Sequence, residues 1–331
     1  MAVSSDVSPE RDAAAGGPAT GRILSVDRFR GALVILMVGG NYLGGVGFVP
    51  SWLKHAPDIG LTVADLVAPA FVFAIGLSYG PSFARRARFG LGVAYRHFLT
   101  RYLALIGIGA ILTAGGTAVA GQPTDWGVLQ AIGVAGLICL VVIRFGTVVR
   151  FAAGAVLLVV FQLILEAGAV PVVHASVQGG FVGALSWGAL LILSTAVADV
   201  WRRGLLPLLL CSGILTVVAV VSVFVVPVAK TRVSLSYVLV TLAVASIAFL
   251  LTDAAARALP RRAGLVSWWG EYPLVLYLLH LLLLALVVLP DAPWWYADAP
   301  PWLAAAQLAV ILVVLSWVAW LLHRGRARVR L

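Results

Sequence analysis

Stretches of apolar residues long enough to cross a lipid bilayer recur along almost the whole chain. A helix needs ~20 residues to cross a hydrocarbon layer of about 30 Å, whereas the strands of a membrane barrel would alternate polar and apolar residues. We therefore expect an all-α integral membrane protein with about ten transmembrane helices in one bundle. The predicted spans lie at roughly 32–49, 63–80, 100–120, 127–145, 148–168, 180–200, 205–227, 234–252, 272–290 and 302–322.

Composition and domain organisation agree with a membrane bundle. Hydrophobic residues make up 62% of the chain, charged residues 11%, and the mean hydropathy is +1.05, which excludes an ordinary soluble domain. No hydrophilic stretch is long enough for a second folded domain. We expect a disordered cytoplasmic leader at 1–24, one transmembrane domain at 25–323 and a basic cytoplasmic tail at 324–331.

The basic residues are distributed very unevenly across the predicted bilayer. If the chain crosses the bilayer at each of the ten spans, 20 of the 23 Lys and Arg residues fall on one side, and Lys54, Lys230 and Arg232 fall on the other. The positive-inside rule places the arginine-rich side, with both termini, in the cytoplasm. The net charge of +10 therefore indicates membrane lipid around the protein, not a nucleic-acid partner. The chain has 21 Arg and 2 Lys, and this preference for arginine is typical of a GC-rich bacterial genome. We therefore expect a bacterial plasma membrane.

The segment "KHAPDIGLTVADLVAPAF" at 54–71 places polar residues between the first two predicted spans. Thr62 and Asp65 fit a capping box for the helix that follows. His55 has no such explanation; Asp65 is close enough in sequence to orient its imidazole, and Asn41 can approach from the preceding helix. An imidazole held in this way suits general-base chemistry on a hydroxyl or an amine. We assign His55, Asn41 and Asp65 as candidate catalytic residues, with helix-to-helix hydrogen bonding as the alternative for Asn41.

Other polar residues could bind a substrate. Lys230 and Arg232 break the charge asymmetry and indicate either an acidic acceptor or a closing salt bridge, for which Asp58, Asp291 and Asp298 are available. A histidine in mid-span is a functional candidate, although an interhelical hydrogen bond is an equal explanation. His174, in an outer loop, has no nearby acid except Glu166. The candidate substrate-binding residues are Asp58, Gln130, Trp126, Lys230 and His280. The two cysteines, Cys139 and Cys211, lie inside predicted spans without metal-ligand or disulfide spacing, so we expect no metal.

Two consecutive segments carry a family resemblance. "RILSVDRFRGALVILMVGGNY" followed by "LKHAPDIGLTVADLVAPAFVFAIG" closely resembles the heparan-α-glucosaminide N-acetyltransferase family of transmembrane acyltransferases. "GVLQAIG" at 127–133, "SLSYVLVTLAVA" at 234–245 and "YPLVLYLLH" at 272–280 are similar to later family segments in the same order. The sequence departs from the family pattern at Asp58, Ile59 and Tyr272, and these departures put the glucosamine substrate of the family in doubt.

The resemblance implies transfer of an acyl group, usually acetyl, from cytoplasmic acyl-CoA to an acceptor across the membrane. The acceptor would be a hydroxyl or amine of an extracytoplasmic sugar or glycolipid, and family precedent adds a possible homodimer. The resemblance gives the catalytic role to His55 and matches Asn41 and Asp65 to family positions. Because CoA is polyanionic, its phosphates should lie on the arginine-rich face, with Arg28, Arg30 and Arg101 as the candidate contacts.

Two other classes of function stay open at this stage. A proton-coupled secondary transporter or lipid-linked sugar flippase would use His55, Asp65 and His280 for proton coupling. The sequence lacks the paired, Gly/Pro-interrupted segments typical of such folds, and its polar residues concentrate around the first two spans. A membrane scaffold is disfavoured because burying Asn41 and His280 in a bilayer is costly.

Overall fold

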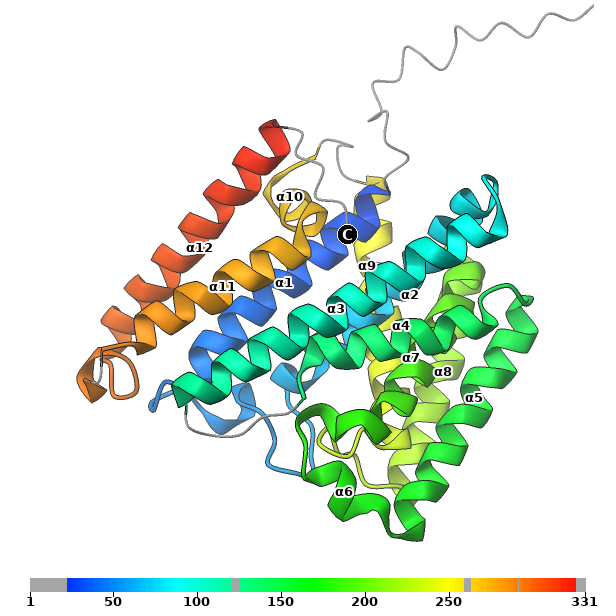
Figure 1. Cartoon of the computed structure of the whole chain (residues 1–331), viewed down its shortest axis with the longest axis horizontal. Helices are drawn as coiled ribbons and strands as arrows, with labels where there is room; N and C mark the ends of the chain where they lie inside the picture. Colours follow the sequence, from blue (N-terminus) through cyan, green and yellow to red (C-terminus); the bar gives the residue numbers. More distant parts are fainter. Residues whose placement is uncertain (1–22, 121–125, 259–262, 291, 326–331) are drawn as a thin grey trace, which may run out of the picture.

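The computed structural model describes residues 23–120, 126–258, 263–290 and 292–325, and for 116–120 only the helical backbone is described. Regular structure within these ranges is helical, and one isolated antiparallel bridge joins Ile59 to Ala229. The all-α membrane class expected from the sequence is therefore supported (Figure 1). The α-helices are α1 (Leu24–Gly44), α2 (Val63–Ala87), α3 (Leu91–Ala120), α4 (Val128–Val142), α5 (Thr147–Ile164), α6 (Val170–His174), α7 (Gly180–Trp201), α8 (Leu205–Val225), α9 (Leu235–Ala258), α10 (Leu265–Glu271), α11 (Pro273–Val288) and α12 (Pro301–Arg324). Shorter turns are η2 (Ser51–Leu53), η3 (Leu165–Ala169), η4 (Val177–Gly179) and η5 (Pro293–Trp295).

Seven of the described helices are long and apolar enough to cross a membrane, counting α5 together with its continuation to His174. An eighth is reached if α10 and α11, which meet at Tyr272 with a bend of 95°, form one broken span. α4 has only 15 residues, and every 18-residue window of α1 contains Asp27, Arg28 and Arg30. Each of the ten predicted windows overlaps a helix, but ten crossings remain a prediction.

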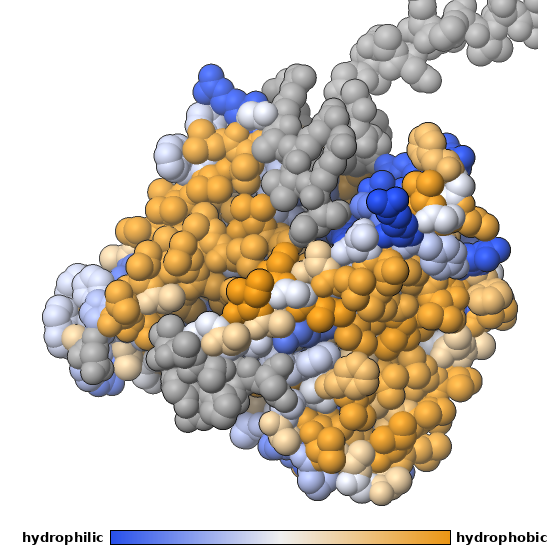
Figure 2. All heavy atoms as spheres, viewed as in Figure 1, coloured by the Kyte–Doolittle hydropathy of each residue, from blue (hydrophilic) through white to orange (hydrophobic). Residues whose placement is uncertain are grey.

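α7 is the central helix of the larger half of the bundle. It packs against α2, α4, α5, α8 and α9, and Figure 1 shows it enclosed by these neighbours. Small residues allow the close approach, because Gly76 of α2 lies against Ser194, and Gly188 of α7 lies against Ile138. The surrounding helices turn apolar side chains outward, and these cover most of the face seen in Figure 2.

α1 crosses α10 at two glycines in the other half of the bundle. A Cβ on Gly31 would overlap the carbonyl oxygen of Val266, and one on Gly270 would overlap the carbonyl oxygen of Asp27. Both positions therefore require glycine, since neither backbone can retreat without moving a whole helix. The crossing holds the first turns of α1 against α10, and α11 and α12 complete this half (Figure 1).

Two loops, 45–62 between α1 and α2 and 226–234 between α8 and α9, are clipped together at one end of the bundle, and we call them the outer loops. The loop between α1 and α2 contributes Asp58, whose carboxylate accepts hydrogen bonds from Arg232 and, at 2.6 Å, from the hydroxyl of Thr231. The N–H of Gly60 donates to the carbonyl of Val228 at 2.8 Å beside the Ile59–Ala229 bridge. Of the two explanations for the outer charge of Arg232, the closing salt bridge is therefore the one observed.

Gly270→Ala should destabilise the protein by about 1–3 kcal/mol, because the added methyl group has no room at the α1–α10 crossing. The loss should appear as a lower melting temperature in detergent. Gly213→Ala is the matched control: nothing lies within 4 Å of a Cβ there, so the melting temperature should stay the same or rise slightly. Equal melting temperatures for both variants would contradict the close crossing.

The clip should open in acid. The hydrogen bond from Arg232 is the main reason that the pKa of Asp58 falls to about 2. A carboxyl group with a lowered folded-state pKa contributes stability above its unfolded value of ~3.9, and the contribution is lost as pH falls toward the folded value. Hydrogen exchange at 58–60 and 228–232 should therefore accelerate between about pH 4 and pH 2. Asp58→Asn should show the fast exchange already at neutral pH, whereas the exposed control Asp298→Asn should not.

Candidate functional site

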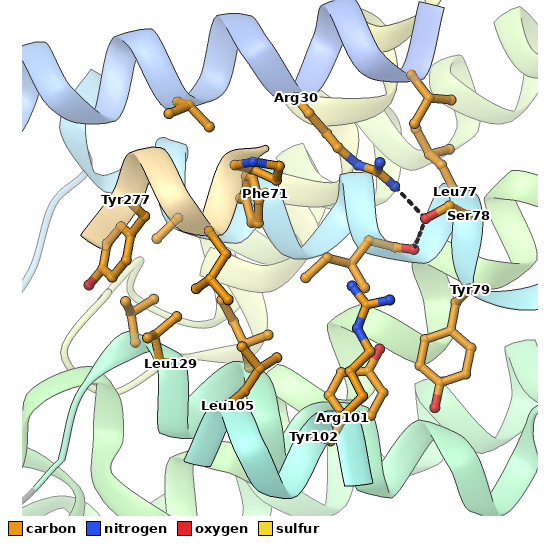
Figure 3. A pocket seen from close by; sticks show the side chains of 18 of the residues that line it. Arg30, Phe71, Leu77, Ser78, Tyr79, Arg101, Tyr102, Leu105, Leu129 and Tyr277 are labelled. Carbon is orange, nitrogen blue, oxygen red and sulfur yellow. Dashed lines mark hydrogen bonds between the residues drawn. The ribbon is translucent and has the colours of Figure 1, made fainter. Parts of the chain in front are cut away.

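A single cavity of about 1700 Å³ connects polar residues of the outer loops with the arginine-rich end of the bundle. α1, α2, α3, α4 and α11 form its walls, and Figure 3 shows Arg30 and Arg101 projecting into it from opposite sides. His55 and Lys230 line it at the outer loops. The middle is apolar, with Phe71 among the lining residues. Imidazole and arginines, far apart in sequence, thus line the same cavity.

His55 is held by a fixed carboxylate. Its Nδ1 lies 2.8 Å from Oδ1 of Asp65, whose side chain is 0% exposed, while the imidazole is 53% exposed. Oδ2 of Asp65 accepts hydrogen bonds from the N–H of Ala56 at 3.1 Å and from the N–H and the hydroxyl of Thr62 at 3.0 Å. In the tautomer that donates to this carboxylate, Nδ1 carries the proton and Nε2 keeps a lone pair. This is the tautomer that a general base requires.

The start of α2 explains why Asp65 is so rigid. Thr62 is the N-cap and Asp65 the third helical residue, so its carboxylate reaches back to the N–H of Thr62, as the capping pattern predicted. The hydroxyl of Tyr237, on α9, donates to the backbone carbonyl of Asp65 at 2.7 Å. One residue therefore caps a helix and orients the imidazole.

Lys230 also reaches this pair. Its Nζ lies 2.9 Å from Nδ1 of His55 and 3.3 Å from Oδ1 of Asp65, and its side chain is 13% exposed. Burial lowers the pKa of Lys230, and the charge of Asp65 opposes that shift. The sequence placed Lys230 with the substrate; the structure places it against the imidazole and its carboxylate.

Asn41 has a different partner from the one expected. Its Nδ2 lies 2.9 Å from Nε2 of His280, which is buried in α11, with the ring of Tyr277 5.2 Å away. Asn41 and Tyr277 line the cavity. The expected approach of Asn41 to His55 is thus replaced by an interhelical hydrogen bond between α1 and α11. Such a bond satisfies two polar groups that the membrane cannot.

The predicted CoA contacts are only partly brought together. Arg30 and Arg101 line the cavity, and Arg30 donates to the hydroxyl of Ser78 and lies 3.7 Å from Asp27. Arg28 is outside the set of lining residues. The sequence analysis missed further lining groups, because a run of arginines after a span was treated only as a determinant of topology. These groups are Arg85, Arg86, Arg88 and His97.

Four of the predicted substrate contacts lie outside the cavity lining, namely His280, which pairs with Asn41, and Asp58, Trp126 and Gln130. Asp58 is engaged in the clip, Trp126 packs edge-on against Phe181, and Gln130 lies against α3, where its Nε2 is 3.5 Å from the hydroxyl of Thr113.

One expectation about a charged partner is wrong, and another concerns a residue that the structure does not describe. His174 lies 3.6 Å from Asp58, so the expectation that Glu166 was its only nearby acid was wrong; Glu166 instead accepts from Gln162. Asp291 lies outside the described residues. Among the residues that the structure describes, no three His, Cys, Asp or Glu side chains come together as a metal-binding group.

A known protein family matches the segment of the chain that contains His55 and Asp65. A family model described as "Heparan-alpha-glucosaminide N-acetyltransferase, catalytic" matches residues 22–201, more than half of the chain. The match includes Asn41, His55 and Asp65 but not Lys230 or His280.

Two curated relatives carry the name heparan-alpha-glucosaminide N-acetyltransferase. The human protein is 42% identical over 126 residues, which cover 34% of this chain and 18% of the human one. The mouse protein is 37% identical over 145 residues, which cover 40% of this chain and 20% of the mouse one. The aligned segments thus span about a fifth of those longer relatives. On the family match, this chain belongs to the heparan-alpha-glucosaminide N-acetyltransferase catalytic family.

Proposed function

We propose that this protein is a membrane-embedded acyltransferase that moves an acetyl or other short acyl group from cytoplasmic acyl-CoA to an acceptor across the membrane. One observation carries the proposal: a single cavity is lined by His55 at the outer loops and by arginines at the opposite end. A polyanionic donor and an outer acceptor can therefore meet without either crossing the bilayer. The names of the relatives support acetyl transfer as the reaction class.

The arginine end of the cavity suits the phosphates of CoA. Arg30, Arg86 and Arg101 approach the same space from α1, α2 and α3, so a phosphate entering there would meet guanidinium groups on several sides. Guanidinium groups bind phosphate oxygens through paired hydrogen bonds. The apolar middle of the cavity accommodates the pantetheine arm and leads the thioester toward His55.

His55 supplies the base. Nε2 takes the proton from the hydroxyl or amine of the acceptor as the acceptor atom bonds to the thioester carbonyl carbon. Throughout this step, Nδ1–H stays hydrogen-bonded to the carboxylate of Asp65. The carbon–sulfur bond then breaks, and the proton passes from Nε2 to the departing CoA thiolate. In a relay, Nε2 attacks the thioester carbonyl carbon and the carbon–sulfur bond breaks, which releases the CoA thiolate; the acceptor then takes the acyl group from Nε2, and the acceptor proton passes to the thiolate.

The direction of transfer follows from the charge distribution. We assign the arginine end to the cytoplasm and the clipped loops to the outside. With the ten crossings expected from the sequence, both termini then lie in the cytoplasm, and the membrane is a bacterial plasma membrane. The acceptor at the outer end is a sugar or glycolipid, since the half-exposed His55 is open to a large polar group.

Acyl transfer can be tested with purified protein in detergent, radiolabelled acetyl-CoA and glucosamine as the acceptor probe. The protein should gain thermal stability with micromolar acetyl-CoA but not with free acetate, because only the thioester carries the CoA phosphates. A protein that ignores acetyl-CoA and instead moves protons with a sugar across proteoliposomes would be a transporter, and the proposal would fail.

His55→Ala should lower kcat by about 10²- to 10⁴-fold, because the base is removed. Asp65→Asn should lower kcat by about 10²-fold through loss of the tautomer. His174→Ala is the matched control, since it is also a half-exposed outer-loop histidine, and its kcat should equal that of the wild type. Normal turnover in His55→Ala with an unchanged melting temperature would exclude His55 as the base.

Arg101→Gln should raise KM for acetyl-CoA about tenfold and leave KM for the acceptor unchanged, because a phosphate contact is lost at the far end of the cavity. Arg96→Gln on the same helix does not line the cavity and serves as the control. An equal rise of KM in both variants would mean that general surface charge, and not the cavity, attracts the donor.

A further inference from the structure

Lys230 is the feature of the site that neither the family match nor the general-base chemistry explains. It lies outside residues 22–201 and comes from the loop between α8 and α9, whereas His55 and Asp65 belong to the loop and helix after α1. It nevertheless lines the same cavity and contacts both side chains.

A tight turn presents Lys230 to the site. The N–H of Val233 donates to the carbonyl of Lys230 at 3.0 Å, and the N–H of Ser234 donates to the carbonyl of Ala229 at 3.1 Å. Val233 has a φ of 51°, a backbone conformation that a β-branched residue rarely adopts. The bridge from Ala229 to Ile59 and the salt bridge from Arg232 to Asp58 then fix this turn against the loop that carries His55. Such strain persists only where the surrounding structure enforces it, and it is common at functional sites.

The charge balance of the site shows what Lys230 contributes. Asp65 is fully buried, and among the described residues the cations within salt-bridge distance of it are Lys230 and, if protonated, His55. A buried carboxylate without a counter-ion is strongly unfavourable. Without Lys230, the imidazole itself would have to supply the positive charge, and a protonated imidazole cannot accept a proton from the acceptor.

We propose that Lys230 is a positioning residue that serves as the counter-ion of Asp65, so that His55 is oriented by the carboxylate yet stays neutral and able to act as a base. This inference rests on the proposed acyl transfer and adds to it a third side chain, delivered by the second outer loop. The clip between the two loops then has a catalytic purpose, because it sets the place of the counter-ion.

The first test is chemical rescue with the full-length protein. Lys230→Ala should lower kcat for transfer from acetyl-CoA to glucosamine about 10²-fold. Methylammonium should raise the kcat of this variant about tenfold, because a small cation can enter the cavity in place of the side chain. Sodium chloride at equal ionic strength should not restore it. Lys54→Ala, next to His55 in sequence, is the control and should keep wild-type turnover. Wild-type kcat in Lys230→Ala, or a loss of kcat that methylammonium does not reverse, would overturn the proposal.

The second test does not depend on activity. Melting temperatures of Lys230→Met, Asp65→Asn and the double variant form a cycle. Lys230→Met should lower the melting temperature of the wild type but not that of Asp65→Asn, since no buried charge is then left without a counter-ion. Additive losses would overturn the counter-ion role. If the wild type transfers no acyl group to any acceptor, the proposed function fails, while the cycle still decides whether Lys230 compensates Asp65.

Discussion

The buried carboxylate of Asp65 is the group on which the outer end of this protein depends. It accepts hydrogen bonds from Ala56, Thr62 and His55, and Lys230 supplies a neighbouring positive charge. A charge this deeply buried at the start of a membrane helix is tolerated only when its oxygens are fully engaged. The same requirement that stabilises the start of α2 therefore orients the imidazole and draws in the second outer loop.

Two pairs of polar side chains elsewhere in the bundle meet the same constraint. Asn41 and His280 pair between α1 and α11, and the hydroxyl of Tyr42 donates to Gln307 of α12 at 2.6 Å. Each pair satisfies groups that hydrocarbon cannot, and so ties one helix to another. The cavity lies beside these paired groups: Arg30 lines it while donating to the hydroxyl of Ser78, and Arg101 lines it from α3.

Local pattern was enough to predict one half of the site. The spacing from Thr62 to Asp65 predicted the cap, and the proximity of His55 to Asp65 predicted their contact, because both interactions lie within eleven consecutive residues. Asn41 shows where such reasoning stops. Its position in the first span suggested His55, whereas its observed partner, His280, lies 239 residues away, and no local pattern could indicate which helix packs beside α1.

Sequence alone determined the membrane class, the helical windows and the polar segment at 54–71, because bilayer thickness and helix capping act on neighbouring residues. Only the tertiary structure decided that Lys230 meets His55, that Arg85, Arg86 and Arg88 line the same cavity, and that Gln130 does not. The physical reason is that these outcomes depend on how helices cross and how loops are clipped together. Crossings such as that of Gly31 and Gly270 are set by the fit of two distant surfaces, which no single segment encodes.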